Sequence, residues 1–458
     1  MLKGHELSAQ YQEFLEEEFA RDAEFVQNEF HYLNANCSNE GLKMDIPLFP
    51  VFLGWEEHES YLKFGELVEG VLGSMLEVVR NPHHSHCTDM KSILGVDAEL
   101  EEILNSKILG RMQPGVVRPD TVLSMGQIKA HEFNVSWPGG IADSDIIMGN
   151  LFENTLFKKF VDRMENRGVT LHNPGRGYTS KLLLQALLET AEMENPYIVL
   201  VHPRPYNPEP DEGVILALWL QEEIRSQGYD CDMIYPDQFE YENGDPTYAG
   251  RHIDVAYRLF EWKHVQGDPG FLGYKKILGA ALNGDLAVVN SFVSEILSAK
   301  SVFELIWDDD FLPCFSQDLI EEIRTYIPRT FNLLKASDED LDYITETKDS
   351  WVVKPVKGSC GMKVFLGKLV DDHGFWNHIL QEARAYDFMV AQEYVETKEL
   401  NILRLSEHGL IQEPCFLDIN PFYIHGRMGH YFSRWSRTYM TAQCGPGMGG
   451  MFPVVVGS

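Results

Sequence analysis

The chain has 458 residues, of which 44% are hydrophobic, so it is long enough for two or three subdomains that share a sizeable core. Its 38 Lys and Arg against 70 Asp and Glu give a net charge of −32, which disfavours binding to nucleic acid and to anionic membranes. Seven scattered cysteines without a CxxC pair are typical of a reduced, cytoplasmic protein. Neither a signal peptide nor a membrane-spanning segment is expected.

The first quarter of the chain is predicted to be helical. Apolar residues recur with helical spacing over 5–30, 58–80 and 97–110. A segment rich in potential metal ligands, His83–Cys87, lies between the last two helices. Four ligands within five residues do not easily reach one tetrahedral ion, so a polar loop is the preferred interpretation.

The middle of the chain has the pattern of an α/β unit. A β-branched run is followed by a helical stretch and a second short strand, an order that indicates a doubly wound subdomain. A further strand precedes a predicted helix that contains Lys300, and beyond about residue 345 strands alternate with glycine-containing turns. The expected elements of the unit cover 196–202, 213–227 and 230–235, and the further strand covers 286–290.

Residues 116–136 form a strong hairpin candidate. Two strand-like runs flank Gly126, which can adopt the positive φ of a tight turn. If the turn centres on Gly126, Asp120 faces Glu132 and Arg118 faces Asn134. Because side chains alternate along a strand, these four lie on one face. The other face carries a core pattern made by Val117, Leu123, Phe133 and Val135.

The opposed carboxylates of this hairpin need a cation between them. Their Cβ atoms would lie about 5 Å apart, where like charges repel each other. Mg²⁺ prefers hard oxygen ligands and keeps coordination sites for water and phosphate, so Asp120, Glu132 and Asn134 suit it. The alternative is a solvated salt-bridge network in which Arg118 is the counter-ion. The spacing leaves both interpretations open.

The ordered residues of 118–140 resemble glutathionylspermidine synthase and related circularly permuted ATP-grasp ligases. The resemblance implies that Asp120, Glu132 and Asn134 bind the Mg²⁺ that holds the ATP phosphates. It also implies that Arg118 stabilises the phosphoryl group and the oxyanion. The matching positions are Arg118, Asp120, Glu132, Asn134, Ser136, Gly139 and Gly140.

Three later segments resemble the same family in the same order, so that the likeness spans about 116–458. They are a helix with a lysine, a strand with a lysine and a glycine loop over 352–364, and an adenine-contacting hinge over 391–395. The ATP contacts that the resemblance implies are Lys300, Lys354, Gly358, Ser359, Gly361, Gln392, Glu393 and Tyr394.

Three further residues are candidates for binding substrate: Ser136, Arg258 and Arg434. Arg258 has the planar donor geometry to bind a carboxylate through two hydrogen bonds. A buried pair of Arg258 with Asp254 or Glu261 is the alternative, and the sequence leaves both open.

The fold that the resemblance implies is an α/β, circularly permuted ATP-grasp fold with a doubly wound, pre-ATP-grasp-like subdomain and an N-terminal helical region. The expected parts are the helical region at 1–115, the metal-binding hairpin at 116–150, the α/β subdomain at 151–285, and the ATP-binding lid with the C-terminal strands at 286–458.

The implied activity is an ATP- and Mg²⁺-dependent, ADP-forming carboxylate–amine ligase that works through an acyl phosphate. Its partners would be a small-molecule or peptide carboxylate and an amine, without nucleic acid or membrane. Two alternatives remain, a non-catalytic nucleotide-binding protein and an ATP-dependent phosphotransferase that forms no amide. The identity of the two substrates and the oligomeric state stay open.

Overall fold

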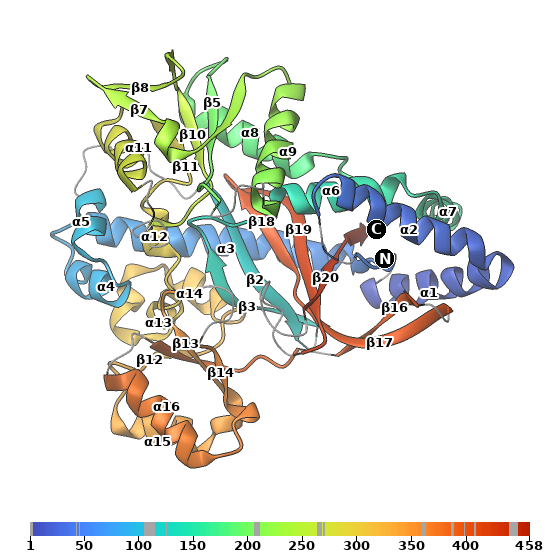
Figure 1. The fold of residues 1–458 in the computed structure, drawn as a ribbon. Coiled ribbons are helices and arrows are strands. Elements are labelled where there is room, and N and C mark those ends of the chain that lie inside the picture. Colours follow the sequence, from blue (N-terminus) through green and yellow to red (C-terminus); the bar gives the residue numbers. More distant parts are fainter. Residues whose placement is uncertain are drawn as a thin grey trace.

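The protein was analysed as a computed structural model. It describes residues 3–104, 115–205, 211–262, 268, 271–358, 363–385, 389–438 and 448–458, apart from 43, 45, 125, 398, 407 and 408. A central antiparallel sheet has an α/β subdomain on one side of it, a smaller subdomain on the opposite side, and a pair of long N-terminal helices to one flank (Figure 1). Within the described ranges, no helix combines the length and the apolar character needed to cross a bilayer.

The central sheet joins the predicted hairpin to the last strands of the chain. Its strand order is β16-β17-β19-β18-β2-β3, with β20 beside β19. Tyr423 of β18 pairs with Val117 of β2, so strands about 300 residues apart are antiparallel neighbours. The bounds are β2 (Val116–Ser124), β3 (Gln127–Asn134), β16 (Leu400–Ser406), β17 (Gly409–Leu417), β18 (Asn420–Ile424), β19 (Arg427–Ser436) and β20 (Met448–Phe452).

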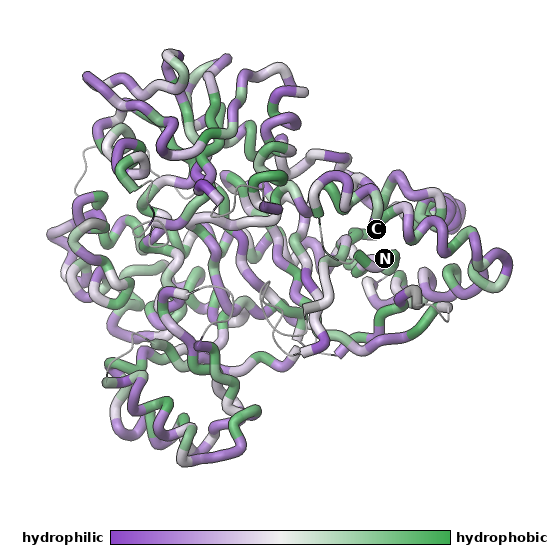
Figure 2. The backbone as a smooth tube through the Cα atoms, viewed as in Figure 1, coloured by the Kyte–Doolittle hydropathy of each residue, from purple (hydrophilic) through white to green (hydrophobic). Residues whose placement is uncertain are grey.

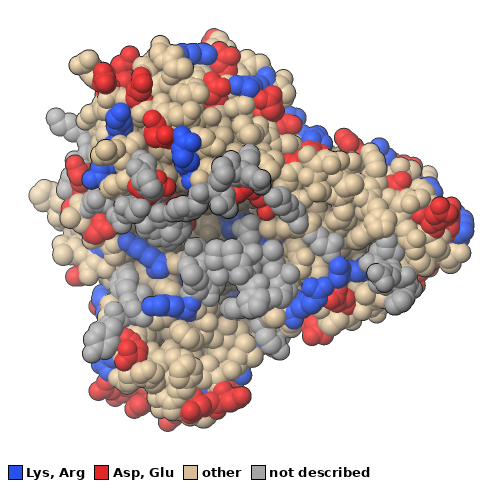
Figure 3. Space-filling model, viewed as in Figure 1, with Lys and Arg blue, Asp and Glu red and all other residues tan. Residues whose placement is uncertain are grey.

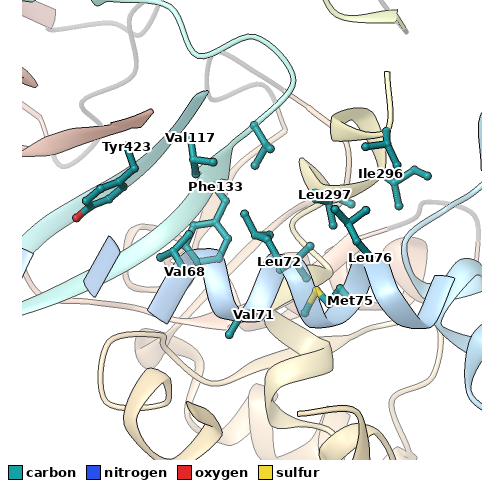
Figure 4. Packing of buried hydrophobic residues seen from close by; sticks show 14 of the residues in the cluster. Val68, Val71, Leu72, Met75, Leu76, Val117, Phe133, Ile296, Leu297 and Tyr423 are labelled. Atoms are coloured by element: carbon teal, nitrogen blue, oxygen red, sulfur yellow. The ribbon is translucent and has the colours of Figure 1, made fainter. Parts of the chain in front are cut away.

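A long helix, α3 (Trp55–Arg80), packs against the back of this sheet. Leu72 and Met75 of α3 lie in the same core as Val117 and Phe133 of the hairpin (Figure 4). Burying side chains of this size stabilises the fold by roughly 1.5–3 kcal/mol each. The core face predicted for the hairpin is therefore confirmed. The helices nearby are α4 (Cys87–Ile93), α5 (Ala98–Leu104), α12 (Ser294–Leu297), α13 (Val302–Trp307) and α14 (Gln317–Ile323).

The single helix predicted over 5–30 is wrong, because the structure has two helices there. Asp22 lies between α1 (Gly4–Arg21) and α2 (Ala23–Asn39). It is the C-cap residue of the first helix and the N-cap residue of the second. The Asp22 carboxylate accepts a hydrogen bond from the backbone N–H of Phe25 at 3.0 Å, an N-cap that starts a new helix. Hydrophobic and hydrophilic residues alternate along both helices (Figure 2), and α2 packs on α6 (Ile141–Glu153) and α7 (Thr155–Glu165).

A small three-stranded sheet ties the beginning of the chain to its end. β1 (Val51–Gly54) runs parallel to β21 (Val454–Gly457), which also pairs with β4 (Leu171–His172). The two ends of the chain consequently lie close together (Figure 1).

The α/β subdomain contains a parallel sheet in the order β11-β10-β5-β6. β11 joins this sheet although it lies beyond the boundary expected at residue 285. The bounds are β5 (Ile198–Val201), β6 (Cys231–Ile234), β7 (Glu240–Glu242), β8 (Asp245–Tyr248), β9 (Arg251–His252), β10 (Val255–Arg258), β11 (Ala287–Val289), α8 (Tyr178–Ala191), α9 (Glu212–Ser226) and α11 (Phe271–Asn283).

The smaller subdomain has a core of its own, in which Trp351, Trp376 and Leu380 pack together. Its antiparallel sheet has the order β12-β15-β13-β14. The helix α16 was not predicted, because strands and turns were expected throughout this region. The bounds are β12 (Thr330–Asn332), β13 (Trp351–Pro355), β14 (Phe365–Leu366), β15 (Met389–Glu393), α15 (Asp338–Glu346) and α16 (His373–Ala385).

Candidate active site

The hairpin of β2 and β3 has the predicted register at its open end. Arg118 pairs with Asn134, and Asp120 pairs with Glu132. Beyond Asp120 the pairing shifts by one residue, so that His131 is the extra residue of a β-bulge. Both His131 and Glu132 line the cavity described below. The bulge therefore keeps Glu132 opposite Asp120, whereas uninterrupted pairing from the turn would bring His131 there.

Asp120 is buried among three donors. The Arg118 Nε donates to its Oδ1 at 3.1 Å, the Asn134 Nδ2 donates to Oδ1 at 2.9 Å, and the Arg434 Nη2 donates to Oδ2 at 2.9 Å. Burial raises the pKa of this carboxyl, but the two guanidinium groups outweigh burial and hold the pKa well below its usual value. Asp120 is thus an anion whose two oxygens are held in fixed positions.

Glu132 is paired with a lysine from a distant segment. The Lys300 Nζ donates to the Glu132 Oε1 at 2.6 Å and to the carbonyl oxygen of Gly358 at 2.8 Å. Burial and the nearby Asp120 raise the pKa of Glu132, but Lys300 and Lys354 together outweigh them, so the pKa is lowered. The salt-bridge interpretation of the hairpin has support because both carboxylates take part in ion pairs. The metal-binding interpretation has support because both also line a cavity.

Lys300 was predicted to lie within a helix, and this prediction is wrong. It lies in the turn between α12 and α13. Its backbone N–H donates to the carbonyl oxygen of Val356 at 2.9 Å, which ties this turn to the strand that precedes the glycine loop. The side chain therefore reaches the hairpin from the same side as Gly358.

Lys354 on β13 is the second lysine of the cavity. Its Nζ donates to the carbonyl oxygen of His131 at 2.6 Å and to the Gln392 Oε1 at 2.8 Å. Burial removes water from the ammonium group, which with the nearby Lys300 lowers the pKa of Lys354 to about 7, against the opposing effect of Glu132. An anionic ligand would restore the charge of this buried lysine.

The predicted adenine hinge lies at the end of β15. Gln392, Glu393 and Tyr394 all line the cavity. The Gln392 side chain is occupied by Lys354 and by Thr330, to whose Oγ1 it donates at 3.1 Å. Gly358 also lines the cavity, whereas the predicted contacts Ser359 and Gly361 lie outside the described residues.

Arg258 and Ser136 are buried and are not among the residues that line the cavity described below, so their role in substrate binding stays a prediction. Arg258 is 1% exposed and donates to the carbonyl oxygens of Asn290 and Phe260, to Ser294 Oγ and to Glu295. The Ser136 carbonyl oxygen accepts another of its hydrogen bonds, at 3.1 Å. The buried pair was the better interpretation, but its partner is Glu295 rather than Asp254 or Glu261.

Arg434 lines the cavity, and two of its guanidinium nitrogens donate to carboxylates of the protein. It donates to Asp120 and, through both Nε and Nη2, to Asp418. The Phe432 ring contacts both arginines. Its centroid lies 4.8 Å from the Arg118 Cζ and 5.5 Å from the Arg434 Cζ. These contacts show that Arg434 holds Asp120 in place, and its role in substrate binding stays a prediction.

One cavity of about 590 Å³ collects the remaining predicted residues. It opens where the central sheet meets the two subdomains, and the molecular surface is hollowed near the centre of Figure 3. The sequence analysis missed Asp143, His202 and Glu212, which line the same cavity. The sequence feature that could have drawn attention to Asp143 is the Gly139-Gly140 pair, which lies directly before the helix that holds it. Gly140 has a φ of 103°, and a Cβ atom there would lie 2.4 Å from the Phe432 ring.

The donors of the cavity fit Mg²⁺ and a nucleotide. Asp120, Glu132 and Asn134 offer hard oxygen atoms on one face, and Lys300 and Lys354 supply charges for phosphate. Among the described residues, no three His, Cys, Asp or Glu side chains are grouped to hold a metal by themselves, at His83–Cys87 or elsewhere.

A family model, described as a circularly permuted ATP-grasp, matches residues 132–392, which is more than half of the chain. The chain belongs to the circularly permuted ATP-grasp family. The order of parts agrees, since the hairpin comes before Lys300 and Lys354 in the chain and pairs with the C-terminal strands. A comparison with the sequences of curated proteins gave no match.

Three solved structures are similar to this chain at low sequence identity, and the first of them shows the same overall fold. A glutathione synthetase-like effector from Globodera pallida, in its apo form, has a TM-score of 0.59 at 11% identity, covering 89% of this chain and 93% of that one. A putative gamma-glutamylcysteine synthetase from Methylobacillus flagellatus has a TM-score of 0.40 at 10% identity, covering 81% and 83%. The D-alanyl-alanine synthetase A of Vibrio cholerae has a TM-score of 0.31 at 12% identity, covering 57% and 89%.

Proposed function

We propose that this circularly permuted ATP-grasp protein is an ATP- and Mg²⁺-dependent carboxylate–amine ligase that forms an amide or peptide bond through an acyl phosphate. One observation carries the proposal. Two opposed carboxylates, two buried lysines and an arginine line a single cavity. This is the set of charges that phosphoryl transfer to a carboxylate requires.

Three hairpin residues, Asp120, Glu132 and Asn134, would hold the magnesium, which neutralises phosphate charge when bound. Lys300 and Lys354 add positive charge beside them. Gln392, Glu393 and Tyr394 form the edge at which an adenine base would be bound. Ser359 and Gly361 remain expected phosphate contacts by resemblance alone.

Arg118 is placed to stabilise negative charge on the reacting carboxylate. Its guanidinium is held by Asp120, by the carbonyl oxygen of Gly139 and by the face of Phe432. Donors fixed in this way need no reorganisation when the oxyanion forms. The substrate carboxylate would attack the γ-phosphorus, and ADP would leave with the electrons of the P–O bond. A neutral amine would then attack the acyl carbon, phosphate would leave with the electrons of the C–O bond, and the nitrogen would release one proton to the departing phosphate.

The variant Glu132→Gln tests the metal-binding role. It removes one negative charge while keeping the size of the side chain, so ADP release should fall at least 100-fold, in line with other charge-stabilising groups. Asp120→Ala is a poorer test, because it leaves the buried Arg118 and Arg434 without their shared partner and endangers folding.

The measurement is ADP release by the full chain with ATP and Mg²⁺, alongside the thermal midpoint of each variant. Glu346→Gln, on the exposed side of α15, is the matched control and should release ADP at the wild-type rate. ADP release by Glu132→Gln at the wild-type rate would refute the assignment of Glu132.

The alternatives differ in which substrates trigger turnover. A ligase requires a carboxylate and an amine together, whereas a phosphotransferase releases ADP with one of them alone. A non-catalytic protein would bind nucleotide without releasing ADP under any condition. Mass spectrometry of reactions with mixed amino acids, glutathione and polyamines would identify the product.

The proposal divides the chain as expected from the resemblance, with one change. The helical region is 1–115, the metal-binding hairpin is 116–150, and the lid with the C-terminal strands follows the α/β subdomain. That subdomain extends to about 290, because β11 is paired in its sheet. A cytoplasmic location and the absence of nucleic-acid partners remain predictions from composition.

A further inference from the structure

Lys300 holds one of the carboxylates that the proposed function assigns to magnesium. Its ammonium donates to the Glu132 Oε1 at 2.6 Å and to the carbonyl oxygen of Gly358 at 2.8 Å. The Lys300 side chain is buried, and its backbone N–H is tied to the carbonyl oxygen of Val356. A metal ion that binds Glu132 therefore meets an ammonium group that is already in contact with the same carboxylate.

Lys300 differs in its freedom to move from the donors that hold Asp120. The Asp120 Oδ1 accepts hydrogen bonds from Arg118 and Asn134, and its Oδ2 accepts one from Arg434. All three donors lie on strands of the central sheet, whereas Lys300 lies in a turn. A lysine ammonium is a point charge at the end of a flexible four-carbon stem. The Lys300 ammonium can therefore leave its carboxylate while the backbone stays in place.

The charges around the hairpin favour a polyphosphate over a free metal ion. The lysines and arginines that act electrostatically on the two hairpin carboxylates are Arg118, Arg434, Lys300 and Lys354. At short range these four charges oppose the approach of a divalent cation and attract phosphate. A nucleotide also supplies metal ligands of its own, because Mg²⁺ is usually bound through one or two carboxylates together with substrate phosphates.

We infer that Lys300 keeps magnesium off the hairpin until nucleotide phosphates draw its ammonium away from Glu132. This role of Lys300 rests on the proposed metal and ATP sites and gives them an order of filling. Its second acceptor, the carbonyl oxygen of Gly358, belongs to the glycine loop that is expected over the phosphates. The ammonium thus moves between two neighbouring anions, and Glu132 becomes a metal ligand only when the nucleotide is present.

Binding of Mn²⁺ to the full chain without nucleotide tests this order without requiring turnover. Mn²⁺ prefers the same carboxylate and carbonyl oxygens as Mg²⁺, and electron paramagnetic resonance of the free ion gives the bound fraction. Lys300→Met removes the ammonium from Glu132 and should bind Mn²⁺ about tenfold or more tightly than the wild type does, as expected for loss of one adjacent like charge. Equal affinities of the two proteins would overturn the inference.

The other lysine of the cavity provides a matched control. Lys354 donates to the carbonyl oxygen of His131 and to Gln392, and within the described part of the chain it donates to no carboxylate. Lys354→Met should therefore raise Mn²⁺ affinity less than Lys300→Met does, and Lys276→Met, exposed on α11, should leave it unchanged. Equal gains in the two cavity variants would show that total charge controls binding, which contradicts competition for Glu132.

Two further variants locate the ion and protect the test against misfolding. Adding Glu132→Gln to Lys300→Met should return Mn²⁺ affinity to that of the wild type, because the freed carboxylate is then absent. Lys300→Gln keeps a hydrogen-bond donor beside Glu132 without the charge, and it should also bind Mn²⁺ more tightly than the wild type. Thermal midpoints identify any variant that is unfolded. Tight Mn²⁺ binding that persists in the double variant would place the ion elsewhere and refute the inference.

Binding of ATP in the presence of EDTA tests the other half of the order. Calorimetry should detect binding of metal-free ATP to the wild type, because Lys300 and Lys354 already supply positive charge for the phosphates. Lys300→Met should weaken this binding about tenfold or more, in line with the loss of a charge-assisted hydrogen bond. Binding of ATP to the wild type only after magnesium is added, or equal binding to the variant, would contradict transfer of the ammonium to phosphate.

The two proposals fail separately. If Mn²⁺ binds tightly to Lys300→Met and not to its double variant with Glu132→Gln, competition for Glu132 stands even when no carboxylate–amine pair releases ADP. In that case only the ligase function is wrong. If Glu132→Gln loses ADP release but Lys300→Met binds Mn²⁺ no better than the wild type, the metal-binding role of Glu132 stands and the exclusion by Lys300 is wrong.

Discussion

Arg258 shows how a residue with the right chemistry for a ligand can be consumed by the fold. Its guanidinium is enclosed by carbonyl oxygens and by Glu295, and its exposed fraction is 1%. Arg118 has the same donors, but it lies on a strand face that borders the cavity. Both are buried arginines paired with a carboxylate. The difference between them is therefore where they lie, since Arg118 borders the cavity and Arg258 does not.

Replacing Arg258 by Met should destabilise the protein by about 3–5 kcal/mol, because Glu295 becomes a buried charge without its partner. Urea denaturation measures the effect. The control Arg251→Met removes an exposed pair with Asp230 and should change stability by about 1 kcal/mol or less. A variant with wild-type stability and a raised KM would restore the substrate-binding role of Arg258.

Glu304 is a buried acid that should make stability depend on pH. Burial raises its pKa from 4.5 to about 7, against a hydrogen bond from Asn332 that lowers it. Between these values the unfolded chain loses the proton that the folded chain keeps, so stability falls as the pH rises from about 4.5 to about 7. Below that window Glu304 is protonated in both states and no penalty exists.

The variant Glu304→Gln should therefore be more stable than the wild type at pH 8, by at most about 3 kcal/mol, and the difference should shrink toward pH 5. Thermal unfolding at both pH values measures it. Glu339→Gln, exposed on α15, should show no comparable pH-dependent difference. A gain at pH 5 as large as that at pH 8 would contradict the buried-acid explanation.

The hairpin shows how an element decides which side chains meet. Its turn pairs Ser124 with Gln127, and continued regular pairing would bring Asp120 opposite His131. The bulge at His131 changes the register before the metal-binding face begins, so Asp120 meets Glu132. The alternation of hydrophobic residues indicated both strands, but an inserted residue leaves no signal in that alternation alone.

Two glycines test the backbone requirements of these elements. Gly126 has a φ of 79° and Gly73 lies in α3, and a Cβ atom at either would meet nothing within 4 Å. Gly126→Ala should destabilise the protein by about 1 kcal/mol through φ alone, whereas Gly73→Ala should stabilise it by about 0.5–1 kcal/mol. Denaturant midpoints of both variants, with unchanged m-values, provide the measurement, and effects of the same sign would contradict the explanation.

At the scale of the whole molecule, the candidate site is assembled from four separate parts of the chain. The hairpin contributes carboxylates, the segment 298–300 and the lid contribute lysines, and the C-terminal strands contribute Arg434. Pairing of β18 with β2 closes the sheet across this distance in sequence. Strands that are far apart in the sequence are thus neighbours beside the candidate site.

The hairpin, its facing residues and its core face could be predicted from the sequence, because they depend on alternation and on one turn, which are local properties. The other candidate segments were found by resemblance, in their order along the chain. The break between the two helices at 4–39 was missed because helical spacing does not reveal a cap such as Asp22. The helix at 373–385 was missed because strands and turns were expected there.

The sequence by itself determined which residues are candidates for the chemistry, since carboxylates, lysines and arginines in this order have few roles in common. Only the tertiary structure decided which of them share a cavity. It buried Arg258, turned Arg434 toward Asp120 and Asp418, and brought Asp143, His202 and Glu212 to the same space. The reason is physical, because long-range strand pairing and burial determine which donors remain available to a ligand, and neither is encoded in any local pattern.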